Sequence, residues 1–500
     1  MLPYIRNILL LLLLATAGVT IHAQVQVGAT IIASENNFAF GQNVQLSENG
    51  MRLVISGYGT SDQGVALFDN VNGEWVEQSF MVPSDFPDSQ TIYSVAMSPD
   101  GNKIAVGSVE NSFENNGNVQ VFQYNGTAWF QKGYTISSEF DNELFGRSIG
   151  ISNDGNRVVV GARLNSEKAA YGGRVAVFQY TNNNWSQLGQ SIFGVETGFK
   201  VGTSVAISSD GAFIFMGSNS YYAYRDRKLK RYEGGIEAYR WLANEWVKTK
   251  EVAGEEFDHF GFDVAISDNG EIYAAGASQF QNGNGYLKTY YNSNNNGILE
   301  YIGYVQATQV EFLGSSVSLS GDGNRVVVGA VLGENQLYSG YVSIYENTGD
   351  EYVSLGAIQG GNSIPKFGST VAMSSDGNTI AVGALYYDYH NANGVEVGSV
   401  RVYDISELQG PEPPEVPEPE PEINKNITIY PSPATNELNC INCEHVSEWY
   451  IADVTGKRIL VNQGGDTSNF IDVSILQTGI YYVFFISENE DVSVKKFIRK

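Results

Sequence analysis

One pattern of apolar and polar positions repeats seven times over residues 24–409. Each unit begins with a short alternating run such as 148–152, turns at a glycine, and continues through an uninterrupted apolar run such as 157–160. A second alternating run, such as 174–180, is followed by a segment led by an aromatic residue such as Trp185. Alternation with a period of two predicts a strand with one buried face, and an uninterrupted apolar run predicts a strand covered on both faces. Each unit therefore predicts four antiparallel strands.

A glycine marks the turn between the first two strands of every unit. It recurs at Gly50, Gly101, Gly155, Gly211, Gly270, Gly323 and Gly377, so successive turns are 51 to 59 residues apart. Four strands in a period of this size predict a β-propeller with one blade per repeat. Helical repeats would need longer runs with a period of 3.6, which the sequence lacks. We therefore expect an all-β chain whose first domain is a seven-bladed β-propeller.

The two ends of the repeat array predict how the ring closes. The seventh unit ends after its third strand, near Tyr403, and lacks a fourth strand. The segment QVQVGATI, from Gln24, aligns with the fourth-strand sequence WSQLGQSI, from Trp185. We expect the N-terminal strand to complete the last blade, because this pairing covers sheet edges that would otherwise be exposed. An open solenoid and two smaller propellers are the alternatives.

Three segments carry a resemblance to a known repeat. They are FGRSIGISNDGNRVVVGA (from Phe145), FGFDVAISDNGEIYAAGA (from Phe260) and FGSTVAMSSDGNTIAVGA (from Phe367). They resemble the FG-GAP repeat of integrin α-subunit propellers, which implies the fold but no particular function. Calcium-binding members carry Asp-x-Asp-x-Asp-Gly in the turn, whereas each turn here offers at most two carboxylates and usually one, such as Asp154. Because calcium takes six to eight oxygen ligands, we expect these residues to shape the turn and predict no metal or other cofactor.

The two ends of the chain predict export and a second domain. Residues 1–23 place an arginine before an apolar run and then small residues, which is the layout of a secretory signal peptide. A retained N-terminal anchor helix is the alternative. Residues 410–424 concentrate proline and glutamate, so they predict an extended spacer after the propeller at 24–409. Residues 425–500 return to alternating patterns, and we expect an Ig-like β-sandwich there.

Several short motifs of the tail match a secretion signal. They are Tyr430-Pro431-Ser432-Pro433, Gly456-Lys457, Asp472-Val473-Ser474 and Gly479-Ile480-Tyr481. This set resembles the type A C-terminal sorting domain of the type IX secretion system of Bacteroidota, whose members have Asn where this chain has Ser432. The resemblance implies passage through the type IX machinery, removal of the tail, and release or attachment to lipopolysaccharide. We therefore expect an extracellular or outer-surface location, with an ordinary Ig-like adhesion module as the alternative.

Charge and cysteine content narrow the classes of partner and site. The chain has 29 Lys plus Arg against 55 Asp plus Glu, a net charge of −26, so its surface repels phosphate backbones and we expect no nucleic-acid partner. Two cysteines exclude a disulfide scaffold and a Cys-based zinc array. In an extended strand Cys440 and Cys443 would lie too far apart to bond. They predict either a local disulfide with a turn at Ile441-Asn442 or two free thiols.

Ligand-binding residues are expected in the two longest loops between second and third strands. From Gly217 to Gly234 is 17 positions and from Gly383 to Gly398 is 15, against 8 to 12 in the other units. Loops that lengthen on a constant scaffold often carry function. The candidates are Tyr221, Tyr222, Tyr224, Arg225, Arg227, Lys228, Lys230 and Arg231 in the fourth loop, and Tyr386, Tyr387, Tyr389 and His390 in the seventh.

The fourth loop predicts contact with an acidic glycan or another polyanion, because aromatic rings stack on sugars and Arg or Lys pairs with carboxylate or sulfate. A solvated loop whose tyrosines pack on a neighbouring blade is the plainer alternative. Asp388 with His390, and Asp258 with His259, are candidate acid–base pairs. The sequence has no nucleophile elbow, phosphate loop or metalloprotease helix, so we predict no catalytic residue. We expect a non-enzymatic protein that binds glycan or protein; a propeller-type polysaccharide lyase or hydrolase and a scaffold without a small-molecule ligand are the alternatives.

Overall fold

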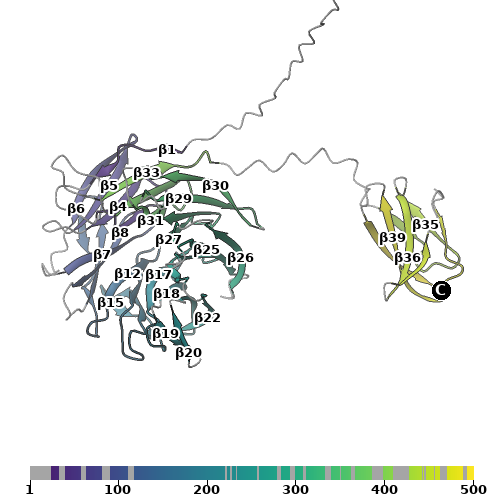
Figure 1. Ribbon diagram of the computed structural model, residues 1–500, viewed down its shortest axis with the longest axis horizontal. Helices are drawn as coiled ribbons and strands as arrows, with labels where there is room; N and C mark the ends of the chain where they lie inside the picture. Colours follow the sequence, from purple (N-terminus) through teal and green to yellow (C-terminus); the bar gives the residue numbers. More distant parts are fainter. Residues whose placement is uncertain are drawn as a thin grey trace, which may run out of the picture. The chain divides into compact units, whose positions relative to one another are not determined.

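The computed structural model divides into two compact units, Met1–Gly410 and Pro411–Lys500, which are described separately (Figure 1). The described residues form strands and no helix, as expected for an all-β chain. In this part of the chain there is accordingly no helix long and apolar enough to cross a membrane. The structure describes residues 24–32, 40–57, 64–81, 90–110, 117–219, 222–225, 228–231, 234–255, 258–278, 283–292, 299–307, 311–332, 339–349, 351–361, 366–385, 398–408, 427–441, 443, 446–454, 457–461, 470–487 and 492–500. The predicted signal peptide and spacer lie outside these residues.

Seven antiparallel sheets make up most of the first unit, and in six of them the strands run in chain order from the inner to the outer edge. In the seventh, the outer edge is formed by the N-terminal strands. Sheet 1 holds β3 (Asn43–Leu46), β4 (Arg52–Gly57), β5 (Gly64–Val71) and β6 (Glu74–Met81); sheet 2 holds β7 (Gln90–Met97), β8 (Lys103–Glu110), β9 (Asn118–Tyr124), β10 (Trp129–Gln131) and β11 (Ile136–Ser137). Sheet 3 holds β12 (Phe145–Ile151), β13 (Arg157–Ala162), β14 (Arg174–Thr181), β15 (Asn184–Gln187) and β16 (Ile192–Phe193); sheet 4 holds β17 (Val201–Ile207), β18 (Phe213–Ser218), β21 (Gly235–Leu242) and β22 (Glu245–Ala253). Sheet 5 holds β23 (Phe260–Ile266), β24 (Ile272–Ala277), β25 (Tyr286–Asn292) and β26 (Leu299–Gln306); sheet 6 holds β27 (Leu313–Leu319), β28 (Arg325–Ala330), β29 (Tyr341–Asn347) and β30 (Tyr352–Gln359). Sheet 7 holds β31 (Phe367–Met373), β32 (Thr379–Ala384), β33 (Ser399–Asp404) and the N-terminal strands β1 (Val25–Gln26) and β2 (Ile31–Ile32).

The uninterrupted apolar run of each unit forms the second strand, which is covered on both faces as predicted. In β13, Val158, Val159 and Val160 are fully buried. Val158 and Val160 belong to the apolar core shared with sheet 2, whereas Val159 belongs to the core shared with sheet 4. Successive side chains of a strand point to opposite faces, so a strand between two neighbouring sheets needs apolar residues at every position.

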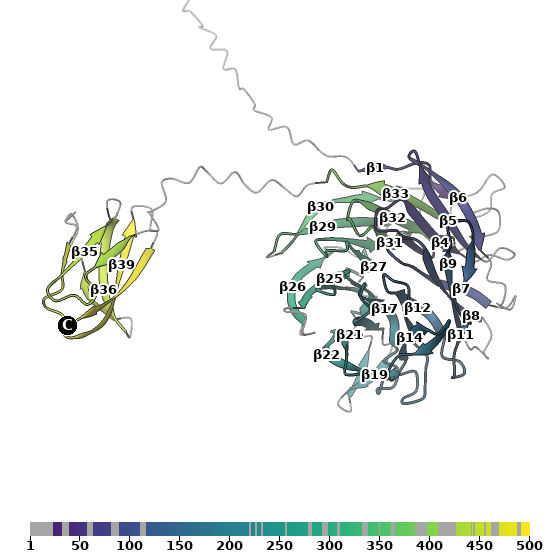
Figure 2. The same cartoon turned by 180° about the vertical axis from the view of Figure 1, so that it is seen from behind.

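The sheets follow one another around a closed ring (Figure 2). An apolar core lies between each pair of neighbouring sheets, and the innermost strands contact one another in order around the ring. The closing core joins Val400 and Val402 of β33 to Leu53 and Ile55 of β4. The first unit is therefore a β-propeller, and the fold class predicted from the repeat is confirmed.

The start of the chain completes the last sheet. Val25 pairs with Asp404 and Ile31 with Val400, both antiparallel along the outer edge of β33. The amide of Val27 also donates a hydrogen bond to the carbonyl oxygen of Val402 at 2.8 Å. The N-terminal segment thus takes the place that β15 and β16 hold in sheet 3, as the sequence alignment predicted.

The repeated glycines lie where neighbouring sheets approach most closely. A Cβ atom on Gly107 would lie 2.0 Å from the carbonyl oxygen of Gly146 in the next sheet, a separation that atoms do not adopt. At the turn of sheet 3, Gly155 has a φ of +60°, and a Cβ there would lie 2.0 Å from Cδ of Lys103 in the preceding sheet. These glycines therefore serve the packing between sheets as well as the turn.

Backbone hydrogen bonds join the turns of neighbouring sheets around the ring. The donor–acceptor pairs are Glu48 to Pro99, Asn153 to Ser209, Ser209 to Asp268, Asp268 to Gly321, Gly321 to Ser375 and Asp376 to Glu48, at 2.7 to 3.1 Å. The missing link is the one in which Pro99 would donate to Asn153, because proline has no N–H. The last bond in this series again joins sheet 7 to sheet 1.

The second unit is a β-sandwich of two antiparallel sheets. One sheet holds β34 (Thr428–Tyr430), β35 (Glu437–Ile441) and β38 (Phe470–Asp472), and the other holds β36 (Val446–Asp453), β37 (Arg458–Val461), β39 (Gly479–Ser487) and β40 (Val492–Arg499). Leu438 and Ile471 of the first sheet share one core with Ile451, Val483 and Phe485 of the second. Packing of two sheets over a common core is the arrangement expected of an Ig-like sandwich.

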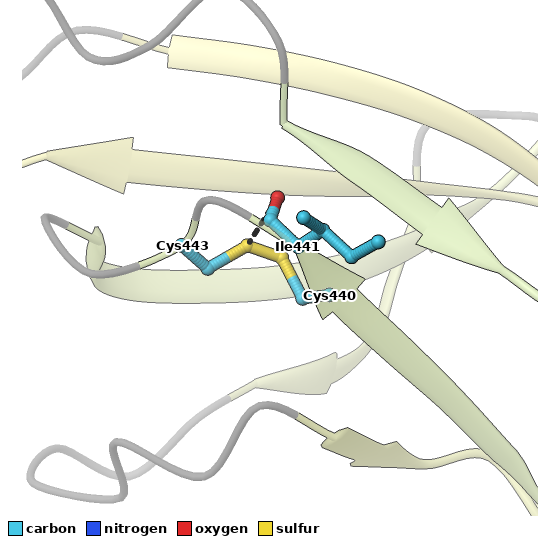
Figure 3. Close-up of a disulfide and its surroundings, with 3 residues drawn as sticks. All are labelled: Cys440, Ile441 and Cys443. Carbon is cyan, nitrogen blue, oxygen red and sulfur yellow. Dashed lines mark hydrogen bonds between the residues drawn. A yellow bond between two sulfur atoms is a disulfide. The ribbon is translucent and has the colours of Figure 1, made fainter.

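The two cysteines of this unit form a disulfide, which was one of the two alternatives (Figure 3). Cys440 lies at the end of β35, and the Cα atoms of Cys440 and Cys443 are 6.0 Å apart. The chain therefore turns between them, as a bond over so short a segment requires. Sγ of Cys443 also lies 3.8 Å from the carbonyl oxygen of Ile441.

Candidate functional site

Both predicted ligand loops open on one end of the propeller, which we call the FG face after Phe145 and Gly146. Inner strands begin at this end, second strands end there, and third strands begin there. Within the described residues, four isolated parallel bridges join neighbouring sheets at this end, such as the one between Gly173 of sheet 3 and Val201 of sheet 4. The FG face therefore collects the loops between second and third strands from every sheet.

The fourth loop forms a hairpin of its own, which the sequence did not predict. Its strands are β19 (Tyr222–Arg225) and β20 (Lys228–Arg231), inserted between β18 and β21 of sheet 4. Figures 1 and 2 both draw this hairpin beside β22. Tyr221 and Arg227 lie outside the described residues. The basic and aromatic segment is thus a two-stranded ribbon added to the FG face.

The register of the hairpin pairs Tyr222 with Arg231, Ala223 with Lys230, Tyr224 with Leu229 and Arg225 with Lys228. Four of the five basic residues predicted for this loop therefore belong to one two-stranded ribbon, in which Arg225 and Lys228 are direct partners along the backbone.

The seventh loop contributes no geometry to the site. Tyr386, Tyr387, Tyr389 and His390 all lie outside the described residues, and so does the predicted acid partner Asp388. Their part in ligand binding stays a prediction, as does the suggested pairing of Asp388 with His390.

Basic residues also gather on the FG face in sheet 4 and its two neighbours, and the sequence analysis missed two of them, Lys200 and Arg163. Lys200 precedes β17, Arg163 follows β13, and His259 precedes β23. Burial, together with the positive charge of Arg163, lowers the pKa of Lys200 to about 8. Burial likewise lowers the pKa of His259 to about 4, with a contribution from Lys200. Because these residues belong to three different repeats, only the fold brings them together.

Asp258, the acid of one predicted acid–base pair, is held by local hydrogen bonds. Its carboxylate accepts the amide of Glu255 at 2.7 Å and that of Phe260 at 2.9 Å. It also accepts a short hydrogen bond from the hydroxyl of Tyr286. Burial raises the pKa of Asp258 to about 6, against the effect of these three donors. All of its partners come from its own sheet and the loop that leads into it.

The same arrangement recurs in sheets where no acid–base pair is present. Glu143 occupies the equivalent position in sheet 3, where it forms a buried ion pair with Arg174 at 2.6 Å. In sheet 6, Glu311 accepts a hydrogen bond from the hydroxyl of Tyr341 at 2.6 Å. The residue after the acid has a positive φ in all three sheets, +55° at Leu144 and Phe312 and +57° at His259. Lys200 has a φ of +57° at the same position of sheet 4, where it follows Phe199 in place of an acid. We therefore infer that Asp258 and His259 shape the backbone where the chain enters the inner strand, and we assign them no catalytic role.

The turns at the end of the propeller opposite the FG face are shaped by their own Asp or Asn side chains, as predicted. Oγ of Ser152 donates to Oδ1 of Asp154 at 2.6 Å, and the same oxygen of Asp154 accepts the amide of Asn156 at 2.9 Å. Oγ of Ser152 in turn accepts the amide of Arg157 at 2.9 Å. The other sheets repeat these bonds, with Asn in place of Asp in sheets 1 and 5. No group of three or more acidic, His or Cys side chains within the described ranges could hold a metal ion.

The second unit matches a known secretion family. The model of the secretion system C-terminal sorting domain covers residues 428–500, nearly the whole sandwich. The chain thus carries a type IX sorting domain, as its motifs predicted, and this domain indicates export to the cell surface or the extracellular space. No curated protein matches the chain in sequence.

Solved structures similar to this chain have little sequence in common with it. Hydrazine synthase of Kuenenia stuttgartiensis is 14% identical, with 71% of this chain and 94% of that chain covered and a TM-score of 0.45. The C-terminal WD40 domain of Sif2 is 11% identical, with 76% and 97% covered and a TM-score of 0.45. A putative 6-phosphogluconolactonase from Bacteroides uniformis is 14% identical, with 73% and 95% covered and a TM-score of 0.45. Likeness at this level says nothing about what this chain binds.

Proposed function

We propose that this chain is an exported, non-enzymatic propeller that binds acidic glycans through the basic part of its FG face. The observation that supports the proposal is the hairpin, whose two strands gather four basic residues and pair Arg225 directly with Lys228 along the backbone. In a protein with a net charge of −26, such a cluster of basic residues is the part of the chain suited to pair with a polyanion. Lys200 and Arg163 add positive charge in the same region.

We also propose the steps of export that the sorting domain implies. Residues 1–23 act as a signal peptide, residues 24–409 form the propeller of seven FG-GAP-like blades, and residues 410–424 are the spacer to the tail at 425–500. The type IX machinery is the partner of the tail, which is removed after export. The propeller is then released or attached to lipopolysaccharide, and the tyrosines and His390 of the seventh loop extend the glycan site.

Titration of the purified full chain with dextran sulfate tests the binding proposal. Dextran, which has the same backbone without charge, is the matched probe, and polygalacturonate tests carboxylate in place of sulfate. We expect dextran sulfate to bind and dextran not to bind. The variant Arg225→Ser with Lys228→Ser is expected to weaken binding by about tenfold or more, since it removes two charges that would pair with sulfate.

A matched variant distinguishes binding at the hairpin from attraction to positive charge anywhere on the chain. Lys457→Ser with Lys496→Ser removes two exposed charges from the sorting domain and is expected to leave the affinity unchanged. Equal affinity of the hairpin variant and the unaltered chain would contradict the proposal. The alternative of a polysaccharide lyase or hydrolase predicts that the polymer shortens, which size-exclusion chromatography of the same mixtures would detect.

A further inference from the structure

The centre of the ring is a channel lined by the inner strands of all seven sheets, with a volume of about 380 Å³. Small ligands occupy protein cavities of roughly this size or larger, about 300 Å³ upward. The channel lies inside the ring, and the hairpin site does not include it. An inference about the channel therefore does not depend on the proposed function.

One row of channel residues shows the chemistry of the wall. Six of the seven inner strands hold a small uncharged polar residue two positions after the glycine of the FG pair, or at the equivalent position. These residues are Asn43, Ser94, Ser148, Ser204, Ser316 and Thr370. The hydroxyl of Ser94 donates to the carbonyl oxygen of Gly146 at 2.6 Å, and Ser148 donates to Gly202 at 2.8 Å. Ser204 and Ser316 make the equivalent bonds. Because the protons of these four hydroxyls are used between sheets, their oxygens can serve a ligand only as acceptors.

The seventh member of this row is Asp263, which lines the channel from β23. Its carboxylate accepts the amide of Val317 in the next sheet at 2.8 Å and that of Val264 at 3.0 Å. Burial raises its pKa to about 6 against these two donors, and no positive charge contributes. Asp263 is therefore an anion held in the channel wall by backbone amides alone.

Serine would fit this position at less cost. Four of the sister positions hold serine that bonds the next sheet, so the fold accepts serine in this row. A half-buried carboxylate without a counterion destabilises the folded state relative to such a residue. A residue that lowers stability where six repeats supply a neutral one is best explained by a ligand.

The lining decides the kind of ligand. Phe262 also lines the channel and is 38% exposed, so an aromatic surface lies beside the carboxylate in sequence and in the same cavity. The charged lining residues are Asp263, Asp268 near the turn end and Arg147 of sheet 3. Near Asp263, hydroxyl acceptors, its carboxylate and the aromatic ring of Phe262 suit an ammonium group. A calcium ion would need six to eight oxygens around one point, and this row supplies only one carboxylate. We propose that the channel binds the ammonium group of a small organic amine, with Asp263 as its counterion.

Calorimetric titration of the full chain with amines tests this site. The probes are glucosamine, putrescine and choline, and N-acetylglucosamine is the uncharged match to glucosamine. We expect at least one amine to bind and N-acetylglucosamine not to bind. Asp263→Ser is expected to weaken amine binding by about tenfold or more, because it removes the counterion. Asp263→Asn serves the same purpose if the serine variant does not fold.

Asp268 supplies the matched control. It also lines the channel, near the turn end, where Oγ of Ser209 donates to its carboxylate at 2.8 Å. Asp268→Ser removes the same charge from the same channel and is expected to weaken amine binding less than Asp263→Ser does, since the carboxylate of Asp268 already accepts the hydroxyl of Ser209. Failure of every amine to bind would overturn the proposal. Equal loss of amine affinity in the two variants would overturn it as well. So would magnesium chloride that binds as tightly as the amine at matched ionic strength.

Discussion

The indole N–H of Trp75 donates a hydrogen bond to the carbonyl oxygen of Val27, 3.2 Å away. Trp185 makes the same bond to Lys132 at 2.6 Å, and Trp246 makes it to Leu188 at 3.0 Å. In each case the indole belongs to one sheet and the carbonyl to the fourth segment of the sheet before it. Since Val27 lies in the N-terminal segment of sheet 7, Trp75 joins the first sheet to the last by the bond that joins neighbours elsewhere.

Deletion of residues 24–32 is expected to destabilise the propeller by about 3 kcal/mol or more. The deletion removes the pairs of β1 and β2 with β33 and the acceptor of Trp75, each bond contributing about 1 kcal/mol. It also exposes the outer edge of β33, which favours association between chains. Urea unfolding and light scattering measure the two effects. An unchanged midpoint in a monodisperse sample would show that the segment is not part of the ring.

Substitution of a glycine between sheets is expected to cost more than substitution of a glycine in an open turn. Gly107→Ala brings a Cβ within 2.0 Å of a backbone oxygen in the next sheet, and we expect a loss of about 3 kcal/mol. Gly349 has a φ of +97° with no atom within 4 Å of its Cβ position, so Gly349→Ala costs only the backbone strain, about 1 kcal/mol. Similar losses in the two variants, measured by urea unfolding, would contradict the close packing of the sheets.

The buried acid of sheet 3 is expected to matter more than its counterpart in sheet 6. Glu143 is fully buried and its partner Arg174 is 2% exposed, so Glu143→Gln leaves a buried positive charge without its counterion. We expect a loss of about 3 kcal/mol. Glu311 bonds the neutral hydroxyl of Tyr341, and Glu311→Gln is expected to cost about 1 kcal/mol or less. Thermal unfolding of both variants measures the contrast, which would vanish if the ion pair were not formed.

The stability difference between the unaltered chain and Asp263→Ser is expected to depend on pH. The pKa of Asp263 is about 6 in the folded state and near 4 when unfolded, so the folded state holds an extra proton between these values. The carboxylate therefore destabilises the fold fully above pH 6 and not at all below about pH 4. Asp258 and His259 titrate in the same range but are common to both chains, so they cancel. We expect the serine variant to be the more stable at pH 7 and the difference to shrink toward pH 4. A difference that is constant with pH would mean that folding does not raise the pKa of Asp263.

The fold could be predicted from the sequence because its rules are periodic. The turn glycines, the alternating runs and the apolar second strands repeat in every unit, and the N-terminal segment has the sequence of a missing fourth strand. The sorting domain was predictable from short motifs such as the one at Tyr430. These features depend on residues that are close in sequence or equivalent between repeats.

The parts of the sites that could not be predicted depend on contacts between repeats. Arg163 and Lys200 lie near each other only because sheets 3 and 4 are neighbours. The fourth loop was predicted as a basic loop, but its hairpin register, which pairs Arg225 with Lys228, follows from the backbone. Asp263 becomes conspicuous only when the inner strands are aligned around the channel and its six counterparts prove to be uncharged.

The salt dependence of dextran sulfate binding tests the central claim most directly. If Arg225 and Lys228 pair with sulfate groups, the logarithm of the association constant falls linearly with the logarithm of the salt concentration. Each charge that contacts the polymer contributes a slope of about 1, so we predict that Arg225→Ser with Lys228→Ser lowers the slope by about 2. Identical slopes for the variant and the unaltered chain would contradict the assignment of the hairpin as the anion-binding surface.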